Sequence, residues 1–160
     1  MIFTSYALRN VMMQMITNNN SNWEYCAFIP RKNSPKWDLH DGLLILVLDG
    51  VHFSVLGVTK LQETQQFVFV HLCNEGRKLP IMYRGDLSDI GASNVTPRHR
   101  IRNTDRTKNG FYVLWFSQML LSFGTDIENI GRNFIRNYFR DFDEDIRIEL
   151  AHWLGNFQHA

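Results

Sequence analysis

The residues best suited to chemistry in this chain are two histidines and an asparagine, each at the edge of an apolar run. His52 follows a turn into one β-prone run and His71 lies near the end of another, so a strand would hold each imidazole where it can act as a general base. A histidine on a strand is more often a satisfied core or edge residue than a base. Asn109 stands directly before a glycine and a long apolar run, where asparagine is among the best helix N-caps.

The two cysteines, Cys26 and Cys73, are too few for a disulfide framework, and we expect buried, reduced thiols in an intracellular protein. Cys26 precedes Ala27-Phe28-Ile29-Pro30, which cannot start a helix, so it lacks the helix N-terminus that favours a nucleophilic thiol. Together with His40 and His71 the cysteines have the ligand types for zinc, but no Cys-x-x-Cys or His-x-x-x-His spacing supports such a site. We therefore predict no metal and no cofactor.

Basic residues gather in the second half of the chain. Five of them lie in an irregular segment over 97–108, and three more are spaced four residues apart over 132–140. Guanidinium groups on a loop beside an arginine stripe suit phosphate backbones, because such contacts need charge more than a fixed geometry for reading bases. The alternative is a solvated helix face whose arginines pair with the acids over 141–145. The candidate nucleic-acid-binding residues are Arg98, Arg100, Arg102, Arg106, Lys108, Arg132, Arg136 and Arg140.

The segments that would position these residues predict an α+β fold, with residues 1–160 as a single domain. Asp49-Gly50 joins two apolar runs and predicts a β-hairpin over 43–58, because this pair tolerates the positive φ angles of a tight turn. Neither run alternates with polar residues, so both faces of the sheet should be covered. A third strand is predicted over 66–73 and a short fourth one over 81–83, in a small antiparallel sheet.

Helices are predicted at both ends of the chain. Apolar residues near helical spacing indicate one over 5–17. Residues 110–123 are almost wholly apolar, and a helix that is apolar on every face must be the buried centre of the fold. Gly124 is expected to end it, and two further C-terminal helices should follow. The polar stretch 84–107 is predicted to be a loop, and loops of that length are usually functional or mobile.

Composition limits the class of protein. Hydrophobic residues make up 44% and aromatic residues 13%, which favours a globular fold over a disordered one. A net charge of +1 says nothing about partners. No secretory core is visible, and no apolar run reaches the roughly 18 residues that span a membrane. We expect a soluble intracellular protein, in the cytoplasm or nucleus, without a membrane partner.

The order of these motifs resembles that of the adenovirus-type and SUMO-specific cysteine proteases over residues 43–123. In that family a histidine followed by an aromatic residue begins a strand, an acid or amide ends the next strand, and a Cys-Gly pair opens a buried central helix. His52, which is followed by Phe53, matches the histidine that acts as the general base in this family, and residues 110–116 match the start of its central helix.

Two positions depart from the family pattern. Where the acid belongs, near the end of the third strand, this chain has His71 and then Asn74 and Glu75. Where the nucleophile belongs it has Asn109, whose carboxamide cannot replace a thiolate in acyl transfer. The resemblance therefore implies either a non-catalytic relative that binds a partner or a protease whose nucleophile has been substituted.

We favour binding over catalysis. The first hypothesis is a non-catalytic interaction or regulatory protein, of viral or mobile-element origin, that binds a host or partner protein; the Asn-rich loop over 18–22 and the compact size fit it. The alternative is a nucleic-acid-binding domain that uses the arginines over 97–108 and 132–140. The second alternative is a cysteine-protease-like hydrolase, with His52 as base, Asn109 at the nucleophile position and a nucleophile that the sequence does not identify.

Overall fold

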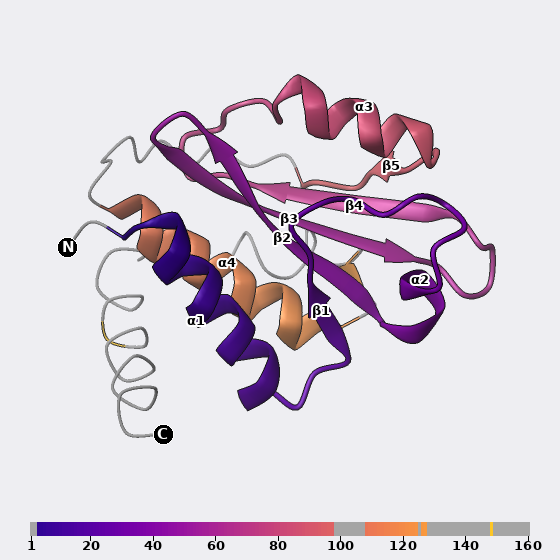
Figure 1. Ribbon diagram of the computed structural model, residues 1–160, viewed down its shortest axis with the longest axis horizontal. Helices are drawn as coiled ribbons and strands as arrows, with labels where there is room; N and C mark the ends of the chain where they lie inside the picture. Colours follow the sequence, from indigo (N-terminus) through magenta and orange to yellow (C-terminus); the bar gives the residue numbers. More distant parts are fainter. Residues whose placement is uncertain (1–2, 98–107, 125, 128–147, 149–160) are drawn as a thin grey trace.

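The structure is a computed structural model that describes residues 3–97, 108–124, 126–127 and 148 (Figure 1). It confirms the α+β fold, and the described residues form a five-stranded sheet whose strands lie in chain order. The strands are β1 (Trp23–Tyr25), β2 (Gly42–Asp49), β3 (His52–Lys60), β4 (Phe67–Leu72) and β5 (Ser93–Asn94). The helices are α1 (Ser5–Asn18), α2 (Lys36–Leu39), α3 (Ile81–Asp89) and α4 (Asn109–Phe123).

The hairpin predicted from the Asp-Gly pair is confirmed. Antiparallel pairing of β2 with β3 begins at Asp49 and His52, on either side of the turn. Gly50 has a φ of 63°, which a glycine adopts without strain. β3 also pairs antiparallel with β4, with Val55 opposite Leu72. The three central strands are therefore antiparallel, as expected.

The two edge strands correct the prediction of a wholly antiparallel sheet. β1 runs parallel to β2, and β5 runs parallel to β4. Each parallel pair needs a crossover connection, which contains α2 in one case and α3 in the other. Strands of three and two residues are too short to show an alternating pattern, so periodicity does not reveal them.

α3 corrects a second prediction. Residues 81–83 begin this helix instead of forming a strand, and the helix and β5 occupy part of the loop predicted over 84–107. The buried residues of α3 are Tyr83 and Leu87, which pack against the sheet four positions apart. Two anchors are a weak helical signal, and two exposed apolar residues just before Tyr83 imitate a strand.

Helices cover both faces of the sheet. α1 and α4 pack on one face, and α2 and α3 pack on the other (Figure 1). In β2, Leu44 and Leu46 belong to the core on the α4 side, whereas Leu43, Ile45 and Val47 belong to the core on the opposite side. Both faces of β2 are thus buried, which explains its nearly continuous apolar sequence.

α4 is the buried helix predicted over 110–123, and it begins one residue earlier. The five consecutive side chains from Tyr112 to Phe116 are at most 7% exposed, so protein surrounds this part of the helix. Gly124 ends the helix with a φ of 60° and donates its N–H to the carbonyl of Leu120. The two C-terminal helices predicted beyond it lie outside the described residues.

α4 lies directly against β3. A Cβ atom on Gly57 would stand 2.9 Å from a methyl carbon of Leu120, closer than real contacts allow. Glycine at this position lets the backbone of the strand approach the helix, because any side chain would meet the buried Leu120. The same packing brings Asn109, at the start of α4, to the start of β3.

Candidate functional site at the start of β3

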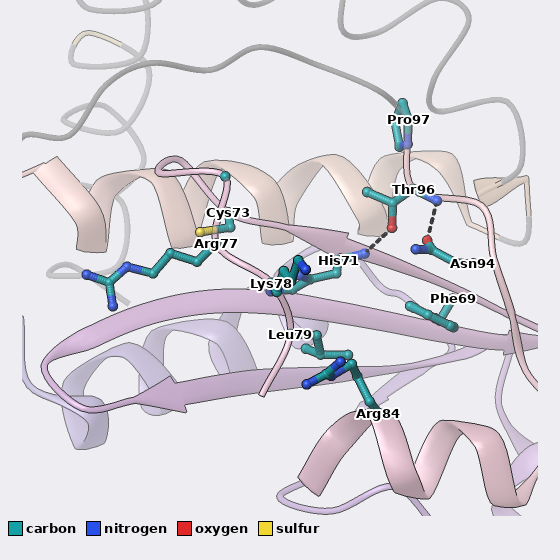
Figure 2. A pocket seen from close by; sticks show the side chains of 11 residues that line it. Phe69, His71, Cys73, Arg77, Lys78, Leu79, Arg84, Asn94, Thr96 and Pro97 are labelled. Carbon is teal, nitrogen blue, oxygen red and sulfur yellow. Dashed lines mark hydrogen bonds between the residues drawn. The ribbon is translucent and has the colours of Figure 1, made fainter. Parts of the chain in front are cut away.

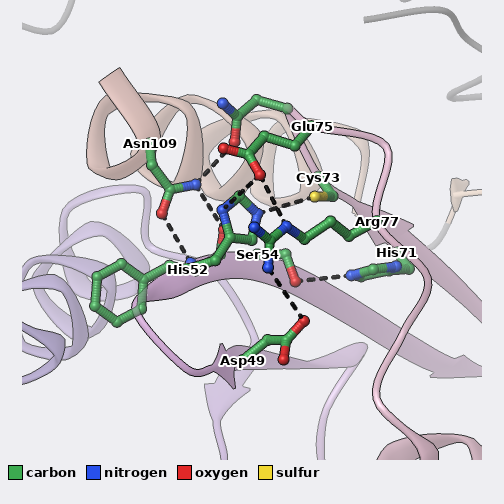
Figure 3. A network of polar contacts seen from close by, with 10 residues as sticks. Asp49, His52, Ser54, His71, Cys73, Glu75, Arg77 and Asn109 are labelled. Carbon is green, nitrogen blue, oxygen red and sulfur yellow. Dashed lines mark hydrogen bonds and ion pairs between the residues drawn. The ribbon is translucent and has the colours of Figure 1, made fainter. Parts of the chain in front are cut away.

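Asn109 is buried between the first turn of α4 and the start of β3 (Figure 3). Its Oδ1 accepts the N–H of Phe53 at 2.8 Å, and its Nδ2 donates to the Phe53 carbonyl at 2.7 Å and to Oδ1 of Asn74 at 2.8 Å. The side chain is 4% exposed, and all three of its polar groups are used. It joins α4 to β3 and to the segment that follows β4.

These bonds overturn the prediction that Asn109 caps α4. Lys108 occupies the capping position, and no side-chain hydrogen bond caps the helix there. An N-cap side chain turns back to a backbone N–H two or three positions on, whereas the Asn109 carboxamide points to β3. The two roles look alike in a sequence, because each puts an asparagine in front of an apolar helix.

His52 opens β3 and contacts a thiol and a carboxylate. Its Nε2 lies 3.1 Å from Sγ of Cys73, within hydrogen-bond distance for sulfur. Its Nδ1 lies 3.6 Å from Oε2 of Glu75, too far for a hydrogen bond but close enough to attract an imidazolium. Nε2 therefore faces a thiol with which it can share a proton, and Nδ1 faces a carboxylate that attracts the positively charged form of the ring.

The two candidate catalytic residues, His52 and Asn109, thus lie at the same end of the sheet. Phe53, the neighbour of His52, forms backbone hydrogen bonds with Asn109. The thiol in contact with His52 belongs to Cys73, which the sequence predicts only as a buried cysteine. This pairing depends on the register of β3 against β4, which no pattern in the connecting residues reveals.

Arg77 contacts the same oxygen of Glu75 that faces His52 (Figure 3). The Nε of Arg77 donates to Oε2 of Glu75 at 2.8 Å, and its Nη1 lies 3.8 Å from Oδ2 of Asp49 at the end of β2. Because the Glu75 side chain is mostly buried, solvent screens this pair less than it screens an exposed ion pair. The carboxylate is thereby fixed beside the imidazole.

His71, the other candidate base, belongs to a separate contact. Its Nε2 lies 2.7 Å from Oγ of Ser54 on β3, and its backbone N–H donates to Oγ1 of Thr96 at 2.8 Å. These bonds join β4 to its neighbours on both sides. His71 therefore has the role of a satisfied strand histidine.

A pocket of about 560 Å³ opens beside these residues (Figure 2). Its walls come from β4, α3 and the segments that precede α3 and follow β5. Its lining includes His71, Cys73 and three cationic side chains, those of Arg77, Lys78 and Arg84. Apolar side chains line it from β4 and from the segment before α3, and Asn94, Thr96 and Pro97 line it from β5 and the residues that follow. This lining suits a small ligand that carries negative charge and some apolar surface.

The other two residues with the ligand types for zinc, Cys26 and His40, lie in different surroundings. Cys26 is buried just after β1, where burial raises the pKa of its thiol. The Nε2 of His40 lies 2.9 Å from Oε2 of Glu24. No group of three metal-binding side chains occurs in the part of the chain that the structure describes.

Two further predictions concern surfaces. Of the predicted nucleic-acid-binding residues, the structure describes only Lys108, which precedes α4; the arginines over 97–108 and 132–140 lie outside the described residues. Nucleic-acid binding therefore stays a prediction. None of the described helices is long and apolar enough to cross a membrane.

Comparison with known proteins bears on the fold of this chain. No family model and no curated protein matches it. Among solved structures, the crystal structure of a de-sumoylating protease is similar, with a TM-score of 0.53 over 98% of this chain and 85% of that chain, at 8% sequence identity. At so low an identity the likeness is one of architecture, and the residues of the site are this chain's own.

Proposed function

We propose that this protein shares the architecture of a SUMO-specific protease without its chemistry, and that it works by binding a partner protein, first of all a small ubiquitin-like modifier. The observation that carries the proposal is the carboxamide at position 109, buried at the start of α4 and held by three hydrogen bonds. In the proteases that the sequence resembles, a cysteine opens this helix.

Acyl transfer at this position would need a thiolate within reach of the base. The chain has a carboxamide at 109, and the ring nitrogens of His52 face Cys73 and Glu75. Asn109 cannot turn toward a substrate without leaving its buried partners unbonded, at a cost of about 1–3 kcal/mol for each. The arrangement supports a structural role for the asparagine and a binding role for the surface around it.

The choice of partner rests on the similar structure, which is that of a de-sumoylating protease. Two exposed apolar side chains on the β2–β3 hairpin flank the site, those of Leu48 and of Val51, the neighbour of His52. Exposed aliphatic side chains beside a pre-formed site are suitable contacts for a protein. We therefore expect the partner to contact this hairpin.

Binding and cleavage are best measured on the same preparation. The chain is titrated against immobilised SUMO and ubiquitin, and incubated with their precursor forms. We expect binding in the micromolar range without cleavage. Val51→Asp should weaken binding at least about tenfold. Ile81→Asp on α3 should leave binding unchanged, and it is a matched control because Val51 and Ile81 are both 77% exposed. Cleavage would contradict the loss of chemistry, and failure to bind any modifier would contradict the choice of partner.

A cysteine at position 109 tests how far the site is from catalysis. Asn109→Cys should remain inactive toward the same precursors, because His52 faces Cys73 and Glu75. Circular dichroism verifies that the variant is folded. Cleavage by this variant would mean that the asparagine alone separates the protein from a protease.

A further inference from the structure

The chain has two buried thiols in different surroundings. Cys26 is 7% exposed, and burial raises the pKa of its thiol. Cys73 is 3% exposed, but its Sγ lies 3.1 Å from Nε2 of His52. An imidazole at this distance can take the thiol proton, and the thiolate that results is the reactive form of cysteine. Cys73 therefore has a proton acceptor that can activate it.

Glu75 supports this proton transfer from the other side of the ring. Its Oε2 lies 3.6 Å from Nδ1 of His52, so the carboxylate favours the tautomer that carries its proton on Nδ1 and leaves Nε2 as the acceptor. The same charge attracts the imidazolium that forms. Arg77, which donates to this oxygen, weakens the attraction but fixes the carboxylate in place.

Cys73 also lines the pocket of about 560 Å³, so the thiol adjoins a space for a small molecule. Three cations share that lining (Figure 2). Arg77 is paired with Glu75. Lys78 and Arg84 are exposed and form no ion pair with the described part of the chain. Those two charges can attract an anionic ligand to the thiol.

We propose that Cys73 is a site of mixed-disulfide formation, at which the thiol attacks a small anionic disulfide that the pocket binds through Lys78 and Arg84. Oxidised glutathione represents this chemical class, because each half carries two carboxylates and one ammonium group and is therefore a net anion at neutral pH. This role does not depend on the binding of a protein partner.

The step conserves atoms and electrons. The proton leaves Sγ of Cys73 for Nε2 of His52, and the thiolate attacks one sulfur of the bound disulfide. The S–S bond of the ligand breaks as the new one forms, so Cys73 is oxidised and the ligand is reduced. The departing thiolate then takes up a proton. A free small thiol reverses the reaction by the same route.

A disulfide fits this site better than an ester or an amide. Acyl transfer develops an oxyanion that needs preorganised hydrogen-bond donors. Thiol–disulfide exchange develops no oxyanion and needs a thiolate, an approach to the sulfur and a stable leaving thiolate. A thiol, an imidazole and a cationic pocket together meet those needs.

Mass spectrometry of the folded chain after treatment with oxidised glutathione tests the proposal. We expect one adduct on Cys73, formed at least about tenfold faster than on Cys26. Cys26 is the internal control, because it is also buried but has no imidazole partner among the described residues. Cystamine, a cationic disulfide, should react with Cys73 more slowly than glutathione does. In urea the two cysteines should react at equal rates.

Two variants separate the roles of charge and base. Lys78→Glu with Arg84→Glu alters only exposed side chains, so it should fold normally. It should slow the reaction with glutathione about tenfold or more and speed the reaction with cystamine. His52→Gln should slow both reagents, because the thiol loses its proton acceptor. The charge variant keeps the test decisive if His52→Gln does not fold.

Three results would each overturn the proposal. The first is no adduct on Cys73 in the folded protein, and the second is equal rates at Cys73 and Cys26. The third is a rate at Cys73 that is the same for anionic and cationic disulfides and does not respond to the charge reversal.

Discussion

At the scale of single residues, the carboxamide of Asn109 has an acceptor side and a donor side, and both are matched. Its oxygen meets the N–H of Phe53, and its nitrogen meets the carbonyl of Phe53 and the side chain of Asn74. An aspartate of the same size would accept from Phe53 but, when ionised, could not donate to the two oxygens. The three hydrogen bonds at this position therefore need the side chain of an amide.

Asn109→Leu keeps the size of the side chain and removes all three bonds. It should lower the free energy of unfolding by about 2–5 kcal/mol, because each buried group left without a partner costs about 1–3 kcal/mol. Gln118→Leu is the control, since Gln118 bonds to Asn19 across two helices in an exposed place; its loss should cost less than about 1 kcal/mol. Urea unfolding measures both, and equal losses would show that burial of the Asn109 bonds is not decisive.

The sequence predicts some of the site residues and not others. His52 and Asn109 are predictable as the starts of a strand and of a helix, because a turn begins the strand and an apolar run defines the helix, and both signals are local. Cys73 reaches His52 through the register of two strands, which is not local. Glu75 and Arg77 follow β4 in an irregular segment, where no periodicity assigns a direction to a side chain.

At the scale of elements, the packing of α4 on β3 holds the site together. The hairpin and α4 are predictable, because turn chemistry fixes the first and complete burial marks the second. The edge strands and α3 are not, since each is short or has few buried residues to reveal its period. The hairpin and α4 are thus easier to predict than α3 and β5, which supply part of the pocket lining.

Substitution of two glycines by alanine should change the stability in opposite directions, with Gly57 testing the packing of α4 on β3 and Gly85 serving as the control. Gly57→Ala should destabilise the protein by about 1–3 kcal/mol, because the new Cβ would lie 2.9 Å from a methyl group of the buried Leu120. Gly85 lies inside α3 with nothing within 4 Å of a new Cβ, so Gly85→Ala should stabilise, by about 0.5–1 kcal/mol. Thermal unfolding compares them. A Gly57→Ala variant as stable as the parent would mean that α4 shifts away from β3 at little cost.

At the scale of the whole molecule, a sheet with helices on both faces resembles that of a de-sumoylating protease at 8% identity. An architecture needs apolar residues at suitable spacing more than particular residues, so it can persist while the residues of a site change. For this reason the sequence predicts the fold class more readily than the chemistry.

Stability of the whole fold should fall at alkaline pH. Burial raises the pKa of Tyr25 above its ordinary value of 10.0 and that of Cys26 above 9.0. Their contribution is fully present at neutral pH, and it is lost as the pH rises, because the unfolded chain releases these protons first. The urea midpoint should decline from about pH 9 upward.

Tyr25→Phe with Cys26→Ala provides the control for this decline. The double variant has neither group to ionise, so its urea midpoint should change less with pH over the same range. A parent protein whose midpoint stays constant up to about pH 10.5 would contradict the argument, because both groups would then have the same pKa folded and unfolded.

The bonds at Phe53 also determine how the molecule opens. β4 ends at Leu72, which lies opposite Val55. The first residues of β3, from His52 to Ser54, therefore precede the backbone pairing of β3 with β4. A carboxamide has the donor and acceptor of a peptide group, and Asn109 bonds to Phe53 as one residue of an adjacent strand would. A helix side chain thus completes the ladder of a sheet. We therefore expect the amide proton of Phe53 to exchange with water when α4 undocks, so that undocking of the helix and fraying of the strand occur together.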